Sequence, residues 1–239
     1  MLSLSLWLIG TSAAWADMVD AKSLLAQADA AYAKREDVSQ ATIAMDFYEK
    51  LGAAGADSAT EAYWKAARAA WWVAEHTPGR TEKLEVFQRG IDDAKKGIAL
   101  NSGMPAAHFW LGANMGSYGD NKGVMKSLSL VKPIRHEMQE VLHLDEKFAA
   151  GGAWRVLGVV DYKVPGLMGG SKKRAKEELD KALAIGPNDP FNHFYMAEYD
   201  KTIGDKAGKE AEVATLRAIK EAKDLEPELK MLQEKAGKL

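Results

Sequence analysis

Three side chains that could bind a metal ion recur at helical spacing near the middle of the chain. His136, Glu140 and His143 lie at positions i, i+4 and i+7, which places them on one face of a helix. Two imidazoles and a carboxylate in that arrangement could hold an ion such as zinc. A solvated helix face within EMQEVLHL explains the same spacing, and we favour that interpretation. We therefore predict no metal site.

The sequence carries no other pattern typical of catalysis. It contains neither G-x-S-x-G nor H-E-x-x-H, and no dinucleotide-binding fingerprint. The absence of cysteine excludes disulfides, thiolate catalysis and cysteine-ligated zinc. His108 and His193 each follow a proline by three residues, and this recurrence indicates a role in starting a helix. We predict no catalytic residue, no cofactor and a protein that is not an enzyme.

The stretch VPGLMGG, residues 164–170, separates two helical-looking segments. It is no phosphate loop, since it follows a helix and lacks G-x-x-x-x-G-K-[ST]. Pro165 would stop the first helix, the glycines would supply positive φ, and Ser171 would cap the second helix. Leu167 and Met168 are apolar on a turn where solvation favours polar residues. We expect them to pack under an insertion or to line an opening for a ligand or partner.

Composition and charge limit the protein class. The chain of 239 residues is 47% hydrophobic and 28% charged, as in an ordinary globular protein. Its formal net charge of −2 gives no electrostatic footprint for nucleic acid. The basic run KKRAK at 172–176 is either a solvated face or a contact for an anionic partner. Abundant Ala, Leu, Glu and Lys, with few alternating β-branched runs, predict an all-α fold.

The amino terminus has the pattern of a secretory signal peptide. Residues 1–16 form a short apolar run that ends in Ala14-Trp15-Ala16, a small-x-small cleavage pattern. The run is shorter than the about 20 residues of a membrane span. We therefore expect a mature chain that begins near Asp17 and is exported as a soluble protein.

Helix junctions repeat along the chain. When GIALNSGMPAAHFWLGA (97–113) is aligned with ALAIGPNDPFNHFYMAE (182–198), prolines, histidines and aromatic residues coincide at an offset of 85. Pro105 matches Pro190, and Trp110 matches Tyr195. The segment VLHLDEKFAAGGAWRVLG (141–158) has a similar residue pattern with a two-residue insertion. This periodicity is typical of tetratricopeptide (TPR)-like helix hairpins.

The hairpins predict an α-solenoid of about four irregular TPR-like pairs in a single domain, residues 17–239. Small residues such as Gly158 and Ala182 would let helices approach closely, while Trp154 and Leu179 would fill the groove. The charged segment KEAEVATLRAIKEAKDLEPELKMLQEKAGK would cap the stack as a carboxyl-terminal helix. The cluster formed by Tyr63, Trp64, Trp71 and Trp72 should lie mostly in the core.

Two stretches, AHFWLGANMGSYGDNKG and GGAWRVLGVVDYKVPGLMGGSKKRAKEELDKALAIGPND, resemble the T-component family of TRAP transporters. The resemblance covers about 150 residues. It implies a periplasmic, non-enzymatic, irregular TPR protein that associates with the substrate-binding P-component of an importer of small organic acids or other small ligands. This chain departs from that pattern in lacking a lipobox cysteine. Eukaryotic regulators of microtubule dynamics share a similar repeat region, but the signal sequence argues against that context.

We expect the turn at 164–170 and the helix from Trp110 to Tyr118 to border a cavity. The candidate residues for ligand or partner contact are Trp110, Asn114, Tyr118, Trp154, Tyr162, Pro165, Leu167 and Met168. A generic periplasmic TPR scaffold for protein–protein interactions is the alternative. The ligand, membrane tethering and the oligomeric state, including a homo-oligomer, stay open.

Overall fold

The computed structural model describes residues 10–55 and 58–239, and every regular element within them is helical. The predicted all-α class is thereby confirmed. The elements are α1 (Gly10–Tyr32), α2 (Val38–Ala53), α3 (Ala59–His76), α4 (Arg80–Leu100), α5 (Pro105–Lys122), α6 (Val124–Leu144), α7 (Gly152–Lys163), the 3-10 turn η1 (Gly166–Met168), α8 (Lys172–Ile185), α9 (Pro190–Ile203), α10 (Lys206–Ala218) and α11 (Glu226–Ala236). Residues 1–9 of the predicted signal peptide lie outside the described residues.

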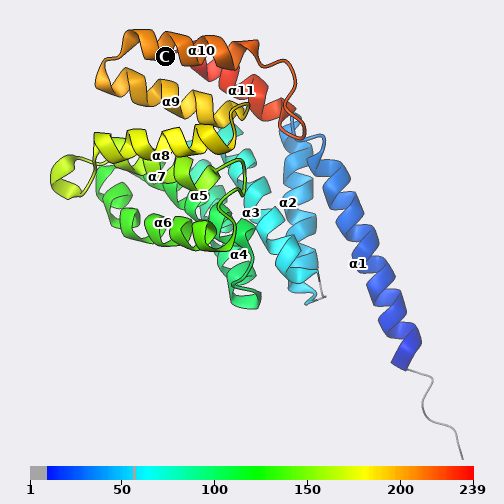
Figure 1. The fold of residues 1–239 in the computed structure, drawn as a ribbon. Helices are drawn as coiled ribbons and strands as arrows, with labels where there is room; N and C mark the ends of the chain where they lie inside the picture. The colour runs from blue at the N-terminus through cyan, green and yellow to red at the C-terminus, as the bar shows by residue number, and fades with distance from the viewer. Residues whose placement is uncertain (1–9, 56–57) are drawn as a thin grey trace, which may run out of the picture.

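Consecutive helices form antiparallel hairpins that stack into a curved solenoid (Figure 1). The pairs are α1 with α2, α3 with α4, α5 with α6, α7 with α8, and α9 with α10. The described residues therefore hold five pairs where the sequence indicated about four. None of the described helices combines the length and apolarity required to cross a bilayer.

The carboxyl-terminal cap differs from its prediction. The segment expected to form one capping helix is divided into α10, which pairs with α9, and α11, which closes the stack. Asp224, at φ of +64°, breaks the helical path just before α11, and Pro227 lies in the first turn of α11. Leu229 and Leu232 of α11 are buried, so this helix contributes to the core.

The recurring prolines and histidines start helices in the same way at both sites. Pro105 and Pro190 begin α5 and α9. The Nδ1 of His108 lies 2.6 Å from a Glu137 carboxylate oxygen, and its Nε2 lies 3.0 Å from the Ser102 carbonyl oxygen. His193 repeats this arrangement with Glu212 at 2.6 Å and the Pro187 carbonyl at 2.8 Å. Each histidine thus ties a helix start to the preceding turn and to the following helix.

The VPGLMGG stretch folds as expected of a helix-to-helix turn. The helix α7 ends just before Pro165, Gly169 adopts φ of +92°, and the Ser171 side chain caps α8 by accepting from the Arg174 backbone N–H. A Cβ at Gly170 would collide with the Val164 carbonyl oxygen, so glycine is required there.

Part of the basic run has a structural role in this turn. Arg174 donates to the Gly169 carbonyl oxygen and, at 2.7 Å, to the buried Asp161 carboxylate, which also accepts from Arg135. Burial would raise the pKa of Asp161, but the hydrogen bonds from both arginines hold it below its usual range. Arg174 is therefore more than part of a solvated face, since it fastens α7, α8 and the turn between them.

Small residues set the distance between neighbouring helices. A Cβ at Gly158 of α7 would lie 2.7 Å from the Cγ of Leu179 on α8, so the predicted close approach is real. The central helix α3 buries a run of alanines together with Trp71 and Trp72, whereas Tyr63 and Trp64 are partly buried. Two of the four residues in the predicted aromatic cluster therefore lie in the core, and the other two lie at its edge.

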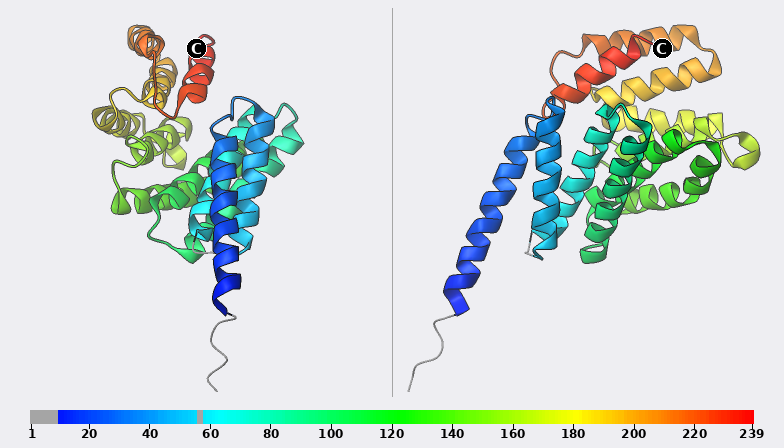
Figure 2. Two further views of the ribbon diagram at one scale, coloured as in Figure 1. Left: turned by 90° about the vertical axis from the view of Figure 1, so that its right-hand side faces the viewer. Right: turned by 180° about the vertical axis from the view of Figure 1, so that it is seen from behind.

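The two ends of the solenoid meet. Arg35, which follows α1, forms a buried ion pair of 2.5 Å with Glu228 of α11 and donates to the Asp224 carbonyl oxygen. The Trp72 indole N–H donates to the Arg35 carbonyl oxygen at 2.6 Å. Figure 2 shows α11 beside the α1–α2 turn in both views. The superhelix is thus closed by a contact between segments 193 residues apart.

Breaking this ion pair should destabilise the fold. Arg35→Met leaves a buried, unpaired carboxylate, so we expect the free energy of unfolding in urea to fall by about 3–5 kcal/mol. The double variant Arg35→Met, Glu228→Leu should recover most of that loss. Lys230→Met, which removes only an exposed pair with Glu36, should leave stability nearly unchanged, because solvent screens that pair. Equal small losses in all three would contradict the central role of the buried pair.

The contact between His193 and Glu212 should make stability depend on pH. The hydrogen bond to Glu212 raises the pKa of His193 above its ordinary 6.5. Its contribution is therefore complete below pH 6.5 and lost as pH rises through the higher folded-state pKa. At pH 6 we expect His193→Gln to lower the free energy of unfolding by about 1–3 kcal/mol, with a smaller deficit at pH 8.5. A deficit that is independent of pH would contradict this assignment; exposed His143→Gln is the control.

Candidate functional site

A cavity of about 590 Å³ lies inside the curve of the solenoid. Its walls come from α3, α5, α6, α7 and α9, with the loop before α11 at one side. The volume falls within the about 300–1,000 Å³ typical of small-molecule sites. The lining residues are Trp71, Phe109, Trp110, Gly112, Ala113, Met115, Gly116, Ser117, Gly119, Asp120, Gly123, Val124, Ser127, Leu128, Val131, Ile134, Ala149, Arg155, Val156, Val159, Val160, Lys163, Val164, Pro165, Asp189, Phe191, Tyr195 and Leu225.

Small residues on α5 leave the space that becomes the cavity. Gly112, Ala113 and Gly116 all belong to this lining. A Cβ at Gly112 would lie 2.4 Å from the terminal methyl of Met138, so this glycine also admits α6. A Cβ at Gly116 would meet nothing within 4 Å. Gly116 therefore faces the open volume.

Aromatic rings close one wall of the cavity. The Trp71 ring lies 5.9 Å from that of Trp110 and 6.1 Å from that of Phe191, measured between centroids. These rings come from α3, α5 and α9, which are brought together by the curvature of the solenoid. The Trp71 indole N–H is satisfied by the Ser117 hydroxyl at 3.2 Å. The wall therefore offers apolar ring surface to a bound molecule.

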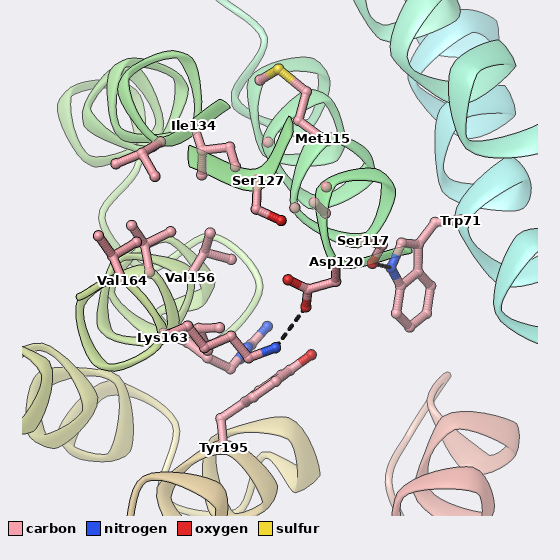
Figure 3. A pocket seen from close by; sticks show the side chains of 18 of the residues that line it. Trp71, Met115, Ser117, Asp120, Ser127, Ile134, Val156, Lys163, Val164 and Tyr195 are labelled. Carbon is pink, nitrogen blue, oxygen red and sulfur yellow. Dashed lines mark hydrogen bonds and ion pairs between the residues drawn. The ribbon is translucent and has the colours of Figure 1, made fainter. Parts of the chain in front are cut away.

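A small polar group interrupts the apolar lining (Figure 3). Lys163 Nζ lies 2.7 Å from a carboxylate oxygen of Asp120, and both side chains are about half exposed. Figure 3 shows the Tyr195 hydroxyl pointing toward this pair. Burial raises the pKa of Tyr195, so its hydroxyl stays protonated and can donate. Lys163 has further N–H donors beyond the one facing Asp120.

Arg155 is a second cation in the lining, but it is already engaged. Its guanidinium donates to Asn192 at 2.7 Å and to Asp189 at 3.2 Å, and the residue is 5% exposed. It thereby fastens α7 to the start of α9. Lys163 is the better placed of the two cations to contact an anionic ligand.

Of the residues expected at the site, Trp110 and Pro165 line the cavity. Asn114 is fully buried between α5 and α3, where it donates to the carbonyl oxygens of Ala67 and Trp110. Tyr118 is half-buried against the core. Tyr162 is buried outside the cavity, where its hydroxyl donates to Glu198.

Trp154, Leu167 and Met168 also lie away from the cavity. Trp154 packs at the edge of the core with its indole N–H donating to Glu146, and the Lys181 ammonium lies 3.9 Å from its ring centroid. Leu167 and Met168 are 101% and 61% exposed on η1. The expectation that these two pack under an insertion or line the opening is wrong, because the short 3-10 turn projects them into solvent.

Sequence motifs do not identify several of the residues that line the cavity. The internal repeat, however, could have identified Tyr195 as one of them. Tyr195 occupies the position equivalent to Trp110 at the offset of 85 residues, and both side chains face the cavity. Lys163 and Asp120 carry no such signal, since they end helices that become neighbours only in the folded chain. Among the residues that the structure describes, His136, Glu140 and His143 do not form a cluster that could hold a metal ion.

Comparison with known proteins places this geometry in a family. The profile of the family described as TRAP transporter T-component matches residues 22–238. The chain is also 24% identical over 190 residues to Regulator of microtubule dynamics protein 3 of Rattus norvegicus, covering 80% of this chain and 39% of that protein. It thus spans about two fifths of the length of this relative.

A solved structure supports the fold assignment. The crystal structure of a thermophilic TPR protein from Thermus thermophilus is similar with a TM-score of 0.65, at 16% identity, over 92% of this chain and 100% of that one. The stacked hairpins are therefore a TPR-type solenoid. With the family profile covering nearly its whole length, the chain belongs to the TRAP transporter T-component family.

Proposed function

We propose that this protein is a non-enzymatic, periplasmic accessory of a TRAP transporter that binds a small ligand in its cavity and associates with the substrate-binding P-component. The observation that carries the proposal is the 590 Å³ cavity at the centre of a T-component solenoid. The signal-like segment at residues 1–16 supports export.

The lining favours a ligand with an apolar body and an acidic head. Valines of α7 and the Trp71, Trp110 and Phe191 rings supply apolar surface. At the polar edge of the cavity, Lys163 and the Tyr195 hydroxyl can donate hydrogen bonds to a carboxylate. An organic acid with an aliphatic or aromatic body satisfies both parts of the lining.

Filling the cavity should weaken ligand binding. Gly116→Phe places a ring in the open volume, because a Cβ there meets no atom within 4 Å. With dodecanoate as the probe and tryptophan fluorescence as the readout, we expect saturable binding to the native chain and at least about tenfold weaker binding to Gly116→Phe.

The matched control is Gly116→Ala, which adds one methyl group and leaves most of the cavity empty. It should retain dodecanoate binding and raise the thermal stability slightly, since alanine is the better helix former. Equal binding by the native chain and the Gly116→Phe variant, with circular dichroism spectra unchanged, would refute the cavity as the ligand site.

The partner requires a separate measurement. We expect the purified chain to co-sediment in analytical ultracentrifugation with the substrate-binding P-component of a TRAP transporter from the same organism. Family membership supports such a complex, and its detection would separate a transport accessory from a generic periplasmic TPR scaffold. Capture of unrelated periplasmic proteins without the P-component would favour the scaffold.

A further inference from the structure

Three helix-hairpin turns lie along one side of the solenoid. We call residues 120–126, 163–176 and 201–206 the basic edge. The ion pair of 2.7 Å between Lys163 and Asp120 joins the first two turns, and Lys172 donates to the Thr202 carbonyl oxygen of the third at 3.4 Å. Figure 1 shows the turns after α7 and α9 on the same side of the molecule.

The basic edge gathers most of the exposed large apolar side chains. Eight such residues are exposed in the part of the chain whose burial the structure describes, and five of them belong to these turns. The five are Val124 (73% exposed), Met125 (83%), Leu167 (101%), Met168 (61%) and Ile203 (41%). They stand at the tips of turns, where no neighbouring helix covers them.

The same turns concentrate positive charge. They contain nine lysine or arginine residues and two aspartates, whereas the whole chain has 32 basic and 34 acidic residues. The nine are Lys122, Lys126, Lys163, Lys172, Lys173, Arg174, Lys176, Lys201 and Lys206. Lys163, Arg174 and Lys176 form ion pairs with Asp120, Asp161 and Asp180, so nearby carboxylates neutralise part of this charge. The turns still carry more basic than acidic residues, whereas the rest of the chain is acidic on balance.

We propose that the basic edge docks on an anionic lipid bilayer. Protruding apolar side chains enter the headgroup region, and the surrounding lysines contact lipid phosphates. The charge argues against a second copy of the chain, because two basic edges would repel each other. The short protruding tips suit a soft surface, whereas a folded acidic protein would need pockets to receive them.

The cavity reaches the basic edge. Gly123, Val124, Lys163, Val164 and Pro165 line the cavity and also belong to or border these turns. Val124 is both exposed and part of the lining, so the cavity opens beside the surface that meets the bilayer. Docking there places the apolar volume next to the membrane.

The test is flotation of the full chain with liposomes. We expect it to bind vesicles of equal parts phosphatidylglycerol and phosphatidylcholine, to ignore pure phosphatidylcholine vesicles, and to dissociate in about 0.5 M NaCl, a concentration of the order that screens surface electrostatics. Lys122→Gln with Lys173→Gln should weaken binding about 25-fold. Leu167→Ser with Met168→Ser should weaken it at least about tenfold. Arg174 is left intact because it holds Asp161.

Matched controls come from the opposite side of the solenoid, near the carboxyl-terminal ends of α4 and α6. Lys95→Gln with Lys147→Gln removes two exposed lysines, and Leu100→Ser with Leu144→Ser removes two exposed leucines. These residues cluster where α4 and α6 end, separated from the basic edge by the length of α5, about 27 Å. Both control variants should bind vesicles as the native chain does.

Other outcomes would overturn the proposal. Absence of flotation with anionic vesicles, or equal losses in the edge and control variants, would refute bilayer docking. Binding to an acidic polypeptide such as polyglutamate without flotation would assign the edge to a protein partner instead. Dodecanoate binding is measured without vesicles, so failure here leaves the proposed function of the cavity standing.

Discussion

The buried ion pair between Arg35 and Glu228 is the contact on which the shape of the solenoid depends. Both side chains are about 5% exposed, so neither charge is tolerable in the core without its partner. Their pairing fixes α11 against the α1–α2 turn, while the Trp72 indole holds the Arg35 backbone to α3. A stack of hairpins could curve by different amounts, and this contact between its two ends helps to hold the curvature seen here. That curvature carries Trp71 of α3 to Phe191 of α9 and so encloses the cavity.

Within the closed shape, the repeat supplies a second constraint. The Pro-x-x-His unit at Pro105 and at Pro190 ties each helix start to the preceding turn and to the helix that follows. Two buried imidazoles are a costly arrangement unless their polar atoms are paired, and here both ring nitrogens of each lie within hydrogen-bond distance of a carboxylate or carbonyl oxygen. Trp110 and Tyr195 then project from equivalent positions into the same cavity. The duplicated packing unit therefore supplies an aromatic side chain to the cavity from each copy.

The sequence predicted the parts of this structure that depend on local chemistry. Proline at a helix start, serine as the α8 cap and glycine in the α7–α8 turn act over a few residues, so their types alone were informative. The same reasoning failed for Leu167, because apolar character on a turn does not distinguish a covered side chain from an exposed one. Local sequence could not identify Lys163 and Asp120 as cavity residues, because their 2.7 Å contact joins two different hairpins. Asn114 was expected at the site, yet a buried amide in a TPR helix is equally suited to bind the backbone of its neighbour.

The glycines of α5 cannot be assigned to helix packing or to the cavity from the sequence alone. Gly112, Gly116 and Gly119 recur at helical spacing and would all be read as close-packing residues. Gly112 and Gly119 do have that role, because a Cβ at either would press on Met138 or Ser127 of α6. Gly116 faces open volume, so packing does not explain it, and glycine inside a helix costs about 1 kcal/mol relative to alanine. A glycine that weakens its helix and leaves a void is consistent with the proposed ligand site, because a larger side chain there would occupy the cavity.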